Sequence, residues 1–246
     1  MTESSPQALL FDVFGTVVDW RTGVATEARR FFDARGIDID PFDFADQWRG
    51  EYQPTMERVR SGGRGYAPLD ELHRENLDIV LERCGLAQHF SEEEKTGLNH
   101  AWERLPPWPD AVPGLTRLKQ RFIVAPCSNG SIALMTRLAK FGALPWDVIL
   151  GADIARTYKP RPEVYLACCA ALQLDPSQVM MVAAHPDDLE AAAACGLSTA
   201  FIPRPQEHGA TQNDMSQSGS QLAMHQAQDW DHTAASLEIL AEILTA

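Results

Sequence analysis

The sequence is poor in basic residues and has no long apolar run. Lysine and arginine number 21 against 34 aspartate and glutamate residues, which gives a formal net charge of −13. This balance argues against nucleic acid or an anionic membrane surface as a partner, because both bind basic patches. No apolar stretch approaches the roughly 20 residues of a membrane-spanning helix. We therefore expect a soluble, cytoplasmic protein.

Cysteine is scarce and forms no recognisable motif. The five cysteines are an odd number, and no two of them have CxxC spacing. Buried free thiols in a reducing compartment are the simplest interpretation. The stretch "MTESSPQALLFDVFG" lacks a basic region followed by a long apolar one, so we expect no signal peptide.

The sequence contains enough apolar residues for a large core. It also shows two contrasting patterns, one helical and one in which strands and helices alternate. Hydrophobic residues make up 45% of the 246 residues, and "QALLFDVFG" is typical of a buried strand. Residues 20–105 then carry helical periodicity, with one helix expected over residues 41–62 and another over residues 91–105 that begins at a Ser91 cap. Residues 106–115 are expected to be a linker. After the Pro-rich "PPWPDAVPGL", strands and helices alternate, which predicts a parallel sheet covered on both faces. The polar stretch 205–228 is expected to be a loop or a poorly ordered insert.

Polar residues follow several of the predicted strands. In open parallel sheets, ligands bind beyond the carboxyl ends of the strands, so these side chains can converge although they are distant in sequence. Asp12 is the most informative, because a carboxylate at the tip of a buried strand costs free energy unless it is paired or used. The others are Ser128, Asn129, His185 and Asp188, with Lys159 on the loop after the predicted strand "WDVILGA".

Four segments in order resemble the haloacid dehalogenase superfamily. They are "FDVFGT", "CSNGS", "YKPRPEVY" and "VAAHPDDLEAA", and together they span essentially the whole chain. The resemblance implies an α/β fold with a Rossmann-like core and a helical cap inserted after the first strand. On this basis we expect residues 1–19 and 106–246 to form the core and residues 20–105 to form the cap.

The sequence departs from the phosphatases of that superfamily at two positions. Their D-x-D arrangement supplies a nucleophile and a general acid, and a further acid helps to hold magnesium; here Phe14 and Ala184 occupy the general-acid and metal-ligand positions. Neither side chain can donate a proton or bind a hard cation. The sequence is instead similar to the 2-haloacid dehalogenase branch, in which halide leaves without protonation. We therefore expect no metal and no cofactor.

The resemblance implies three catalytic residues. Asp12 would attack the carbon that carries the halogen and become an aspartyl ester. Lys159 would keep Asp12 ionised, and Asp188 would pair with Lys159 and place the water that hydrolyses the ester. Thr16 would support the Asp12 carboxylate, whereas the adjacent Asp187 is expected only to favour a helix N-terminus.

The same resemblance implies the residues that bind substrate and halide. Arg49 would receive the halide or orient the substrate, although a solvated helix arginine is the alternative. Ser128 would hold the substrate carboxylate, with Asn129 near the halide. Tyr165 matches a tyrosine of the dehalogenase motif but could also be a packing aromatic. His185 would narrow the halogen pocket or donate to the halide; the alternative is that it positions a loop or water.

The function expected from these residues is hydrolysis of short 2-haloalkanoic acids to 2-hydroxy acids. Haloacetate and (S)-2-haloacids would be the substrates, and relatives suggest a homodimer. Two alternatives remain open. One is a phosphatase with an unusual site that acts on a small phosphate ester, and the other is a non-catalytic binding protein of the same fold.

Overall fold

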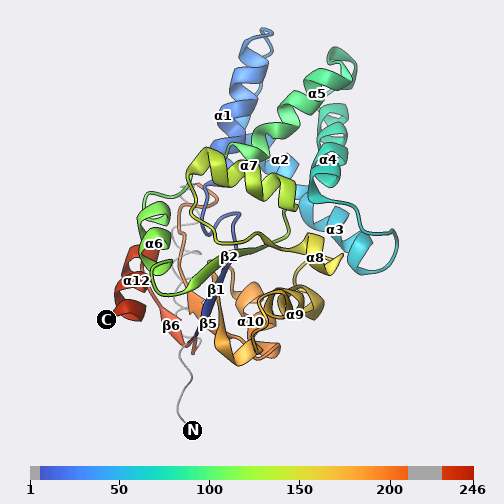
Figure 1. Cartoon of the computed structure of the whole chain (residues 1–246). Helices are drawn as coiled ribbons and strands as arrows, with labels where there is room; N and C mark the ends of the chain where they lie inside the picture. Colours follow the sequence, from blue (N-terminus) through green and yellow to red (C-terminus); the bar gives the residue numbers. More distant parts are fainter. Residues whose placement is uncertain (1–5, 210–228) are drawn as a thin grey trace.

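A parallel six-stranded sheet forms the centre of the molecule (Figure 1). The structure is a computed structural model that describes residues 6–209 and 229–246. The strand order is β3-β2-β1-β4-β5-β6, and every pairing is parallel. The predicted α/β fold is confirmed. The strands are β1 (Ala8–Phe11), β2 (Ile123–Ser128), β3 (Leu150–Gly151), β4 (Val179–Ala183), β5 (Ser198–Phe201) and β6 (His232–Thr233).

Helices cover both faces of the sheet, as the alternating sequence pattern predicts. On β1, Leu9 and Phe11 point into one apolar cluster and Ala8 and Leu10 into the other. The first cluster lies under α6 (Ala111–Leu118), α7 (Ile132–Gly142) and α12 (Leu237–Thr245), and the second under α9 (Pro162–Ala171) and α10 (Pro186–Ala194). The short α8 (Ala152–Ala155) and η3 (Pro176–Gln178) lie in the connections.

The segment between β1 and α6 is helical in every element that the structure describes there. Its helices lie together beyond the carboxyl ends of the strands (Figure 1). They are α1 (Trp20–Asp33), α2 (Pro41–Gly50), α3 (Tyr52–Arg60), α4 (Leu69–Arg83), η1 (Ala87–His89), α5 (Glu92–Asn99) and η2 (His100–Glu103). We call residues 20–105 the cap segment; that it is a cap domain distinct from the core stays a prediction.

Three local predictions differ from the structure. The segment 41–62 is split into two helices at Glu51, and α6 begins at Ala111, inside the stretch expected to be a linker. The helix that starts at the Ser91 cap ends at Asn99 and continues as a 3-10 turn. Most of the expected loop, residues 210–228, lies outside the described part of the chain.

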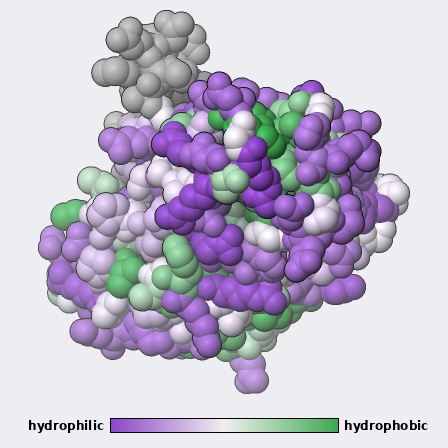
Figure 2. Space-filling model, turned by 90° about the horizontal axis from the view of Figure 1, so that it is seen from above, coloured by the Kyte–Doolittle hydropathy of each residue, from purple (hydrophilic) through white to green (hydrophobic). Residues whose placement is uncertain are grey.

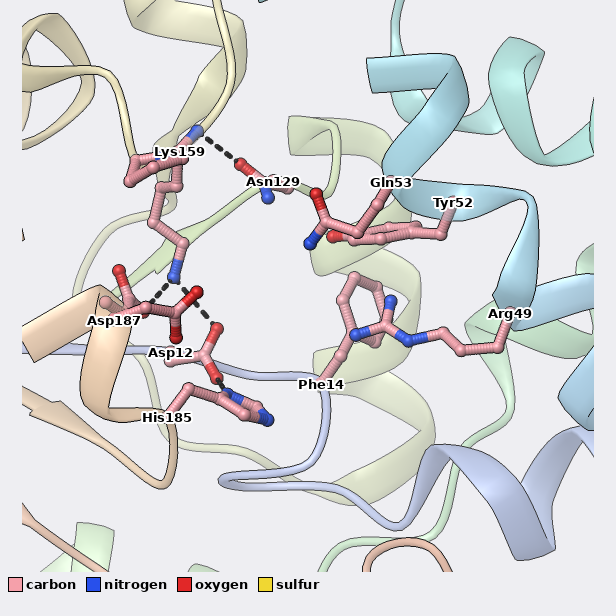
Figure 3. Close-up of a pocket in the computed structure, with 11 residues that line it drawn as sticks. Asp12, Phe14, Arg49, Tyr52, Gln53, Asn129, Lys159, His185 and Asp187 are labelled. Carbon is pink, nitrogen blue, oxygen red and sulfur yellow. Dashed lines mark hydrogen bonds and ion pairs between the residues drawn. The ribbon is translucent and has the colours of Figure 1, made fainter. Parts of the chain in front are cut away.

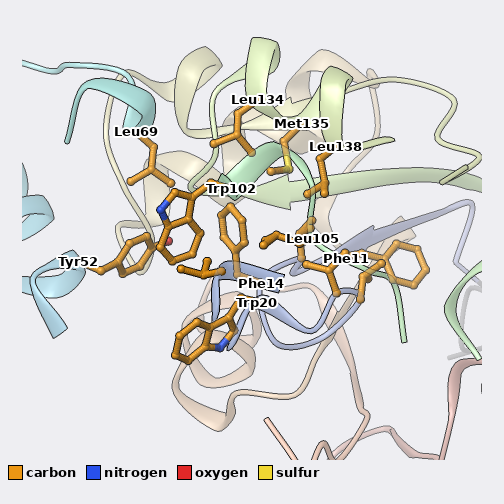
Figure 4. Close-up of a cluster of buried hydrophobic side chains, with 14 of the residues drawn as sticks. Phe11, Phe14, Trp20, Tyr52, Leu69, Trp102, Leu105, Leu134, Met135 and Leu138 are labelled. Carbon is orange, nitrogen blue, oxygen red and sulfur yellow. The ribbon is translucent and has the colours of Figure 1, made fainter. Parts of the chain in front are cut away.

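An aromatic cluster joins the loop after β1 to the cap segment (Figure 4). Phe14 is 3% exposed and packs edge-on against Trp102, with 5.8 Å between ring centroids. Trp102 in turn stacks on Trp20 and on His73. Such edge and stacked pairs add to the free energy of apolar burial. Phe14 therefore attaches the cap segment to the sheet edge.

The outer surface is more polar than this interior. Seen from above, the molecule is mainly hydrophilic, and its apolar residues are scattered in small patches (Figure 2). Within residues 6–209 and 229–246, no helix has both the length and the apolar character needed to cross a bilayer.

Close packing of α6 on α12 gives a test of the fold. A Cβ at Gly114 would lie 2.6 Å from the backbone of Leu237, whereas a Cβ at Gly97 in α5 would meet nothing within 4 Å. We expect Gly114→Ala to lower the free energy of unfolding by about 1–3 kcal/mol, because α12 must move. Gly97→Ala should leave it unchanged or raise it by up to ~1 kcal/mol. Urea titration measures both, and equal effects would contradict the packing.

Candidate active site

Asp12 follows β1 and carries a carboxylate that is almost fully buried, with 7% of the residue exposed. Three side chains donate to it, and two of them, Lys159 and His185, are drawn in Figure 3. Thr16 Oγ1 lies 2.7 Å and His185 Nδ1 2.9 Å from Oδ2, and Lys159 Nζ lies 2.9 Å from Oδ1. The buried carboxylate is thus fully paired, and its donors come from three separate segments.

The charges around Asp12 keep it ionised. Burial alone would raise the pKa of Asp12, but the Lys159 ammonium and the hydrogen bond from His185 outweigh burial and hold the pKa far below its usual range. A carboxylate is the nucleophilic form of aspartate, and the acid is not. Asp12 is therefore charged throughout the physiological pH range.

Lys159 bridges two carboxylates at the centre of the site. Its Nζ donates to Asp12 Oδ1 and to Asp188 Oδ2, and its backbone N–H donates to Asn129 Oδ1 at 2.8 Å. Burial opposes the charge, but Asp12 and Asp188 together raise the pKa of Lys159 well above its usual value. Lys159 is therefore a permanent cation that ties β1, β2 and α10 together at the sheet edge.

Asp188 lies on the far side of Lys159, in the first turn of α10. Tyr165 donates its hydroxyl to Asp188 Oδ1. Burial, and then the charge of Asp12, raise the pKa of Asp188 despite its bond to Lys159. A carboxylate with a raised pKa is a stronger base than an ordinary aspartate, which suits it to accept a proton from water.

His185 joins Asp12 to a residue that the sequence interpretation did not single out. Its Nε2 lies 3.0 Å from Glu207 Oε2 and 3.2 Å from Oε1, and Glu207 is only 5% exposed. Both ring nitrogens thus have partners in the described part of the chain, so this geometry does not support direct donation from His185 to the leaving halide. The signal that could have revealed Glu207 is an acid shortly after β5, at the same sheet edge as Asp12.

A small cavity opens beside Asp12, with a volume of about 110 Å³. One wall is aromatic, formed by Phe14 and Tyr52 from the cap side (Figure 3). The remaining lining comes from Asp12, Arg49, Gln53, Asn129, Lys159, Pro160, His185, Asp187 and Asp188. A cavity of this size admits only a small molecule.

Arg49 places a charged guanidinium group in the lining of this cavity. Its guanidinium lies 3.9 Å from the ring centroid of Tyr52 and 5.3 Å from that of Trp20. Arg49 Nη1 is buried and has no hydrogen-bond partner within the described part of the chain. A buried donor without a partner costs free energy, so a ligand anion would stabilise it. Of the two interpretations given above, the structure favours the binding arginine over the solvated one.

Two predicted binding residues lie behind the cavity rather than in its wall. Ser128 is fully buried, and its Oγ accepts from the Gly130 N–H at 3.0 Å. Tyr165 is also fully buried and contacts Asp188. Neither side chain is among those that line the cavity. Direct contact of Ser128 or Tyr165 with substrate is therefore not supported by this geometry, whereas Asn129 does line the cavity.

The site does not fit the magnesium ion of the phosphatases described above. Ala184 offers no side-chain oxygen, and its backbone N–H donates to Thr16 Oγ1 at 2.9 Å. Lys159 Nζ already lies within hydrogen-bond distance of both Asp12 and Asp188. An ammonium between two carboxylates repels a divalent cation from the same oxygens. No step through a metal is derived from this site.

Comparisons with known proteins agree with this arrangement. Residues 6–196 match the family model described as haloacid dehalogenase-like hydrolase. The chain is 33% identical to (S)-2-haloacid dehalogenase 1 of Pseudomonas sp. (strain CBS-3), over 82% of this chain and 88% of that one. It is 25% identical to a phosphoglycolate phosphatase of Psychrobacter arcticus, over 78% of this chain and 81% of that one.

A solved structure is similar over almost the whole length. The crystal structure of a defluorinating L-2-haloacid dehalogenase is 47% identical, with a TM-score of 0.91, and the similarity covers 98% of this chain and 96% of that one. The same family is indicated by the order of the motifs, by the parallel sheet, and by the arrangement of Asp12, Lys159 and Asp188. The chain belongs to the haloacid dehalogenase-like hydrolases.

Proposed function

We propose that the chain hydrolyses short 2-haloalkanoic acids to 2-hydroxy acids, with haloacetates and (S)-2-haloacids as substrates. One observation carries this proposal: a buried, ionised Asp12 faces a small cavity in which no general acid lies two residues on, because that position is Phe14. Such a nucleophile expels only a group that leaves without a proton, and halide is one. The relatives named as (S)-2-haloacid dehalogenases support the same substrate class.

In the first step, Asp12 displaces halide from the carbon next to the substrate carboxylate. The new carbon–oxygen bond forms as the carbon–halogen bond breaks, and the halide leaves with the bonding electron pair. The guanidinium of Arg49, with its unpartnered Nη1, is placed to receive the halide or to orient the substrate. Lys159 offsets the repulsion between the anionic nucleophile and the anionic substrate.

In the second step, water attacks the carbonyl carbon of the Asp12 ester. Asp188 is the base for this step, because its pKa is raised by burial and by Asp12, and Tyr165 and Lys159 hold it in place. The proton taken from water then passes to the leaving oxygen of the product, which departs as a 2-hydroxy acid. The carboxyl group of Asp12 loses its remaining proton to solvent and returns to its ionised form.

The dimensions of the cavity favour the smallest substrates. Phe14 and Tyr52 close its apolar side, and His185 is held against the other side by Asp12 and Glu207. We propose that His185 narrows the pocket because its bonds to Asp12 and Glu207 hold its ring in the wall. The cap domain, the homodimer and the cytoplasmic location also stay predictions.

A panel of substrates tests the function against its alternatives. We expect the purified protein to release halide from chloroacetate and (S)-2-chloropropionate, with no loss after treatment with a chelator. It should release no phosphate from an alkyl phosphate such as phosphoglycolate, with or without magnesium, because Phe14 cannot protonate the leaving alkoxide. Phosphate release without halide release would establish the phosphatase. Binding of haloacids without turnover would establish the binding protein.

The role of Arg49 is tested by its replacement with methionine, which keeps the length but removes the charge. We expect Arg49→Met to lower kcat/KM for chloroacetate by about 10²-fold or more, since a buried charge partner is worth several kcal/mol in the transition state. The exposed Arg58, in the adjacent helix α3, provides the matched control. Steady-state kinetics should show Arg58→Met unchanged; equal losses in both variants would point to net charge instead.

A further inference from the structure

The two oxygens of the Asp12 carboxylate have different surroundings. Oδ2 receives Thr16 Oγ1 at 2.7 Å and His185 Nδ1 at 2.9 Å, whereas Oδ1 receives Lys159 Nζ. When one oxygen forms the ester, the other becomes its carbonyl oxygen and gains negative charge as water attacks. Two donors converging on one oxygen at these distances are the geometry of an oxyanion hole.

We propose that Asp12 attacks through Oδ1, that Thr16 and His185 form an oxyanion hole around Oδ2 during ester hydrolysis, and that Glu207 is the positioning residue that holds His185 there. This inference rests on the proposed dehalogenation. Oδ1 is the freer oxygen, because Lys159 can keep its bond to Asp188 when Oδ1 becomes alkylated.

The direction of the Thr16 hydroxyl is set by its other neighbour. The backbone N–H of Ala184 donates to Thr16 Oγ1 at 2.9 Å. This contact occupies a lone pair of the hydroxyl oxygen, so the hydroxyl hydrogen is available for Asp12 Oδ2. Thr16 is therefore a donor before the ester forms and remains one afterwards.

His185 can donate from Nδ1 only while that nitrogen carries a proton. Burial alone would lower the pKa of His185, but its hydrogen bonds to Asp12 and Glu207 raise the pKa well above the usual value. Other ionisable groups near this pair are Lys159, on the opposite side of Asp12, and His208, 4.0 Å from Glu207. Ester formation removes the charge of Asp12, which leaves Glu207 as the carboxylate that keeps His185 protonated.

Glu207 is rigidly held against the nucleophile loop. Its Oε1 accepts from Trp20 Nε1 at 2.9 Å, and nearby Arg204 donates to the carbonyl oxygen of Thr16 at 2.9 Å. Gly15 has φ +90°, and a Cβ there would lie 2.1 Å from Glu207 Oε1. Only glycine leaves room for the carboxylate at this point, so the loop and Glu207 fit each other.

With these roles, every bond, electron pair and proton of the hydrolysis step is accounted for. Water oxygen bonds to Cγ of Asp12 as Asp188 takes its proton, and the carbonyl electron pair moves to Oδ2, between Thr16 and His185. Collapse of the oxyanion breaks the bond from Cγ to Oδ1, and the departing oxygen takes the proton from Asp188. His185 keeps its proton throughout.

Single-turnover kinetics with chloroacetate test the inference, because they separate halide release from ester decay. In Glu207→Gln the ring loses its charged partner, so the pKa of His185 in the ester falls. We expect halide release to stay within about threefold, since the donors on Oδ2 are not needed for alkylation. Ester decay should slow by about 10-fold or more, because a neutral imidazole is a weaker donor to the oxyanion than the charged ring. Relative to the unsubstituted protein at the same pH, the loss should become smaller as the pH falls, because His185 regains its proton whereas Asp188 titrates in both proteins.

Two further variants complete the test. Thr16→Val removes the other donor with little change in shape and should also slow ester decay more than halide release. Glu27→Gln is the matched control, because Glu27 is a partly buried glutamate of α1 paired with Arg104 at 2.7 Å; both steps should be unchanged. Quenching followed by mass spectrometry of the Asp12 peptide measures the ester.

The outcomes separate this inference from the function on which it rests. A slower ester decay in Glu207→Gln and Thr16→Val, with halide release retained, supports the oxyanion hole. Equal slowing of both steps, or slowing of halide release alone, overturns it while the dehalogenase function stands. If the unsubstituted protein releases no halide from any haloacid, the proposed function and this inference fail together.

Discussion

The bridge that Lys159 makes between Asp12 and Asp188 is the interaction on which the rest of the site depends. A buried carboxylate would take up a proton without a cation beside it, and a protonated aspartate cannot displace halide. Lys159 itself stays charged because two carboxylates face it. The same ammonium lies within hydrogen-bond distance of both acids and repels a divalent cation from their oxygens. This contact therefore sets the reactivity of Asp12, whereas Phe14 in the general-acid position sets the class of leaving group.

The cap segment and the sheet each supply what the other lacks. The strand ends provide Asp12 and its charged partners, whereas the cap segment provides Arg49, Tyr52 and Gln53. Phe14 links the two halves: it stands where a phosphatase has its general acid, and its ring packs against Trp102. Phenylalanine at position 14 thus both removes a proton donor and adds a contact with the cap segment. This explains why the departure from the phosphatase pattern carries structural as well as chemical consequences.

The sequence was sufficient to predict the sheet and the meeting of Asp12, Asn129, Lys159 and Asp188, because the carboxyl ends of parallel strands share one edge. It did not reveal Glu207, which lies in a polar stretch that resembles an ordinary loop and is buried by its contacts with Trp20, His185 and Gly15. It also placed Ser128 and Tyr165 on the substrate, because side-chain direction and depth depend on packing and not on motif spacing. The break at Glu51 was missed for the same reason, since both helices pack on α4.

Asp12 as the covalent nucleophile is the central claim, and isotope transfer tests it most directly. In a single turnover in ¹⁸O-labelled water, with enzyme in excess over chloroacetate, the account predicts that the label enters the carboxylate of Asp12 and that the product glycolate carries unlabelled enzyme oxygen. Mass spectrometry of the Asp12 peptide and of glycolate reads both. Label found in glycolate alone, with Asp12 unlabelled, would contradict the account, because water would then have displaced halide without an ester.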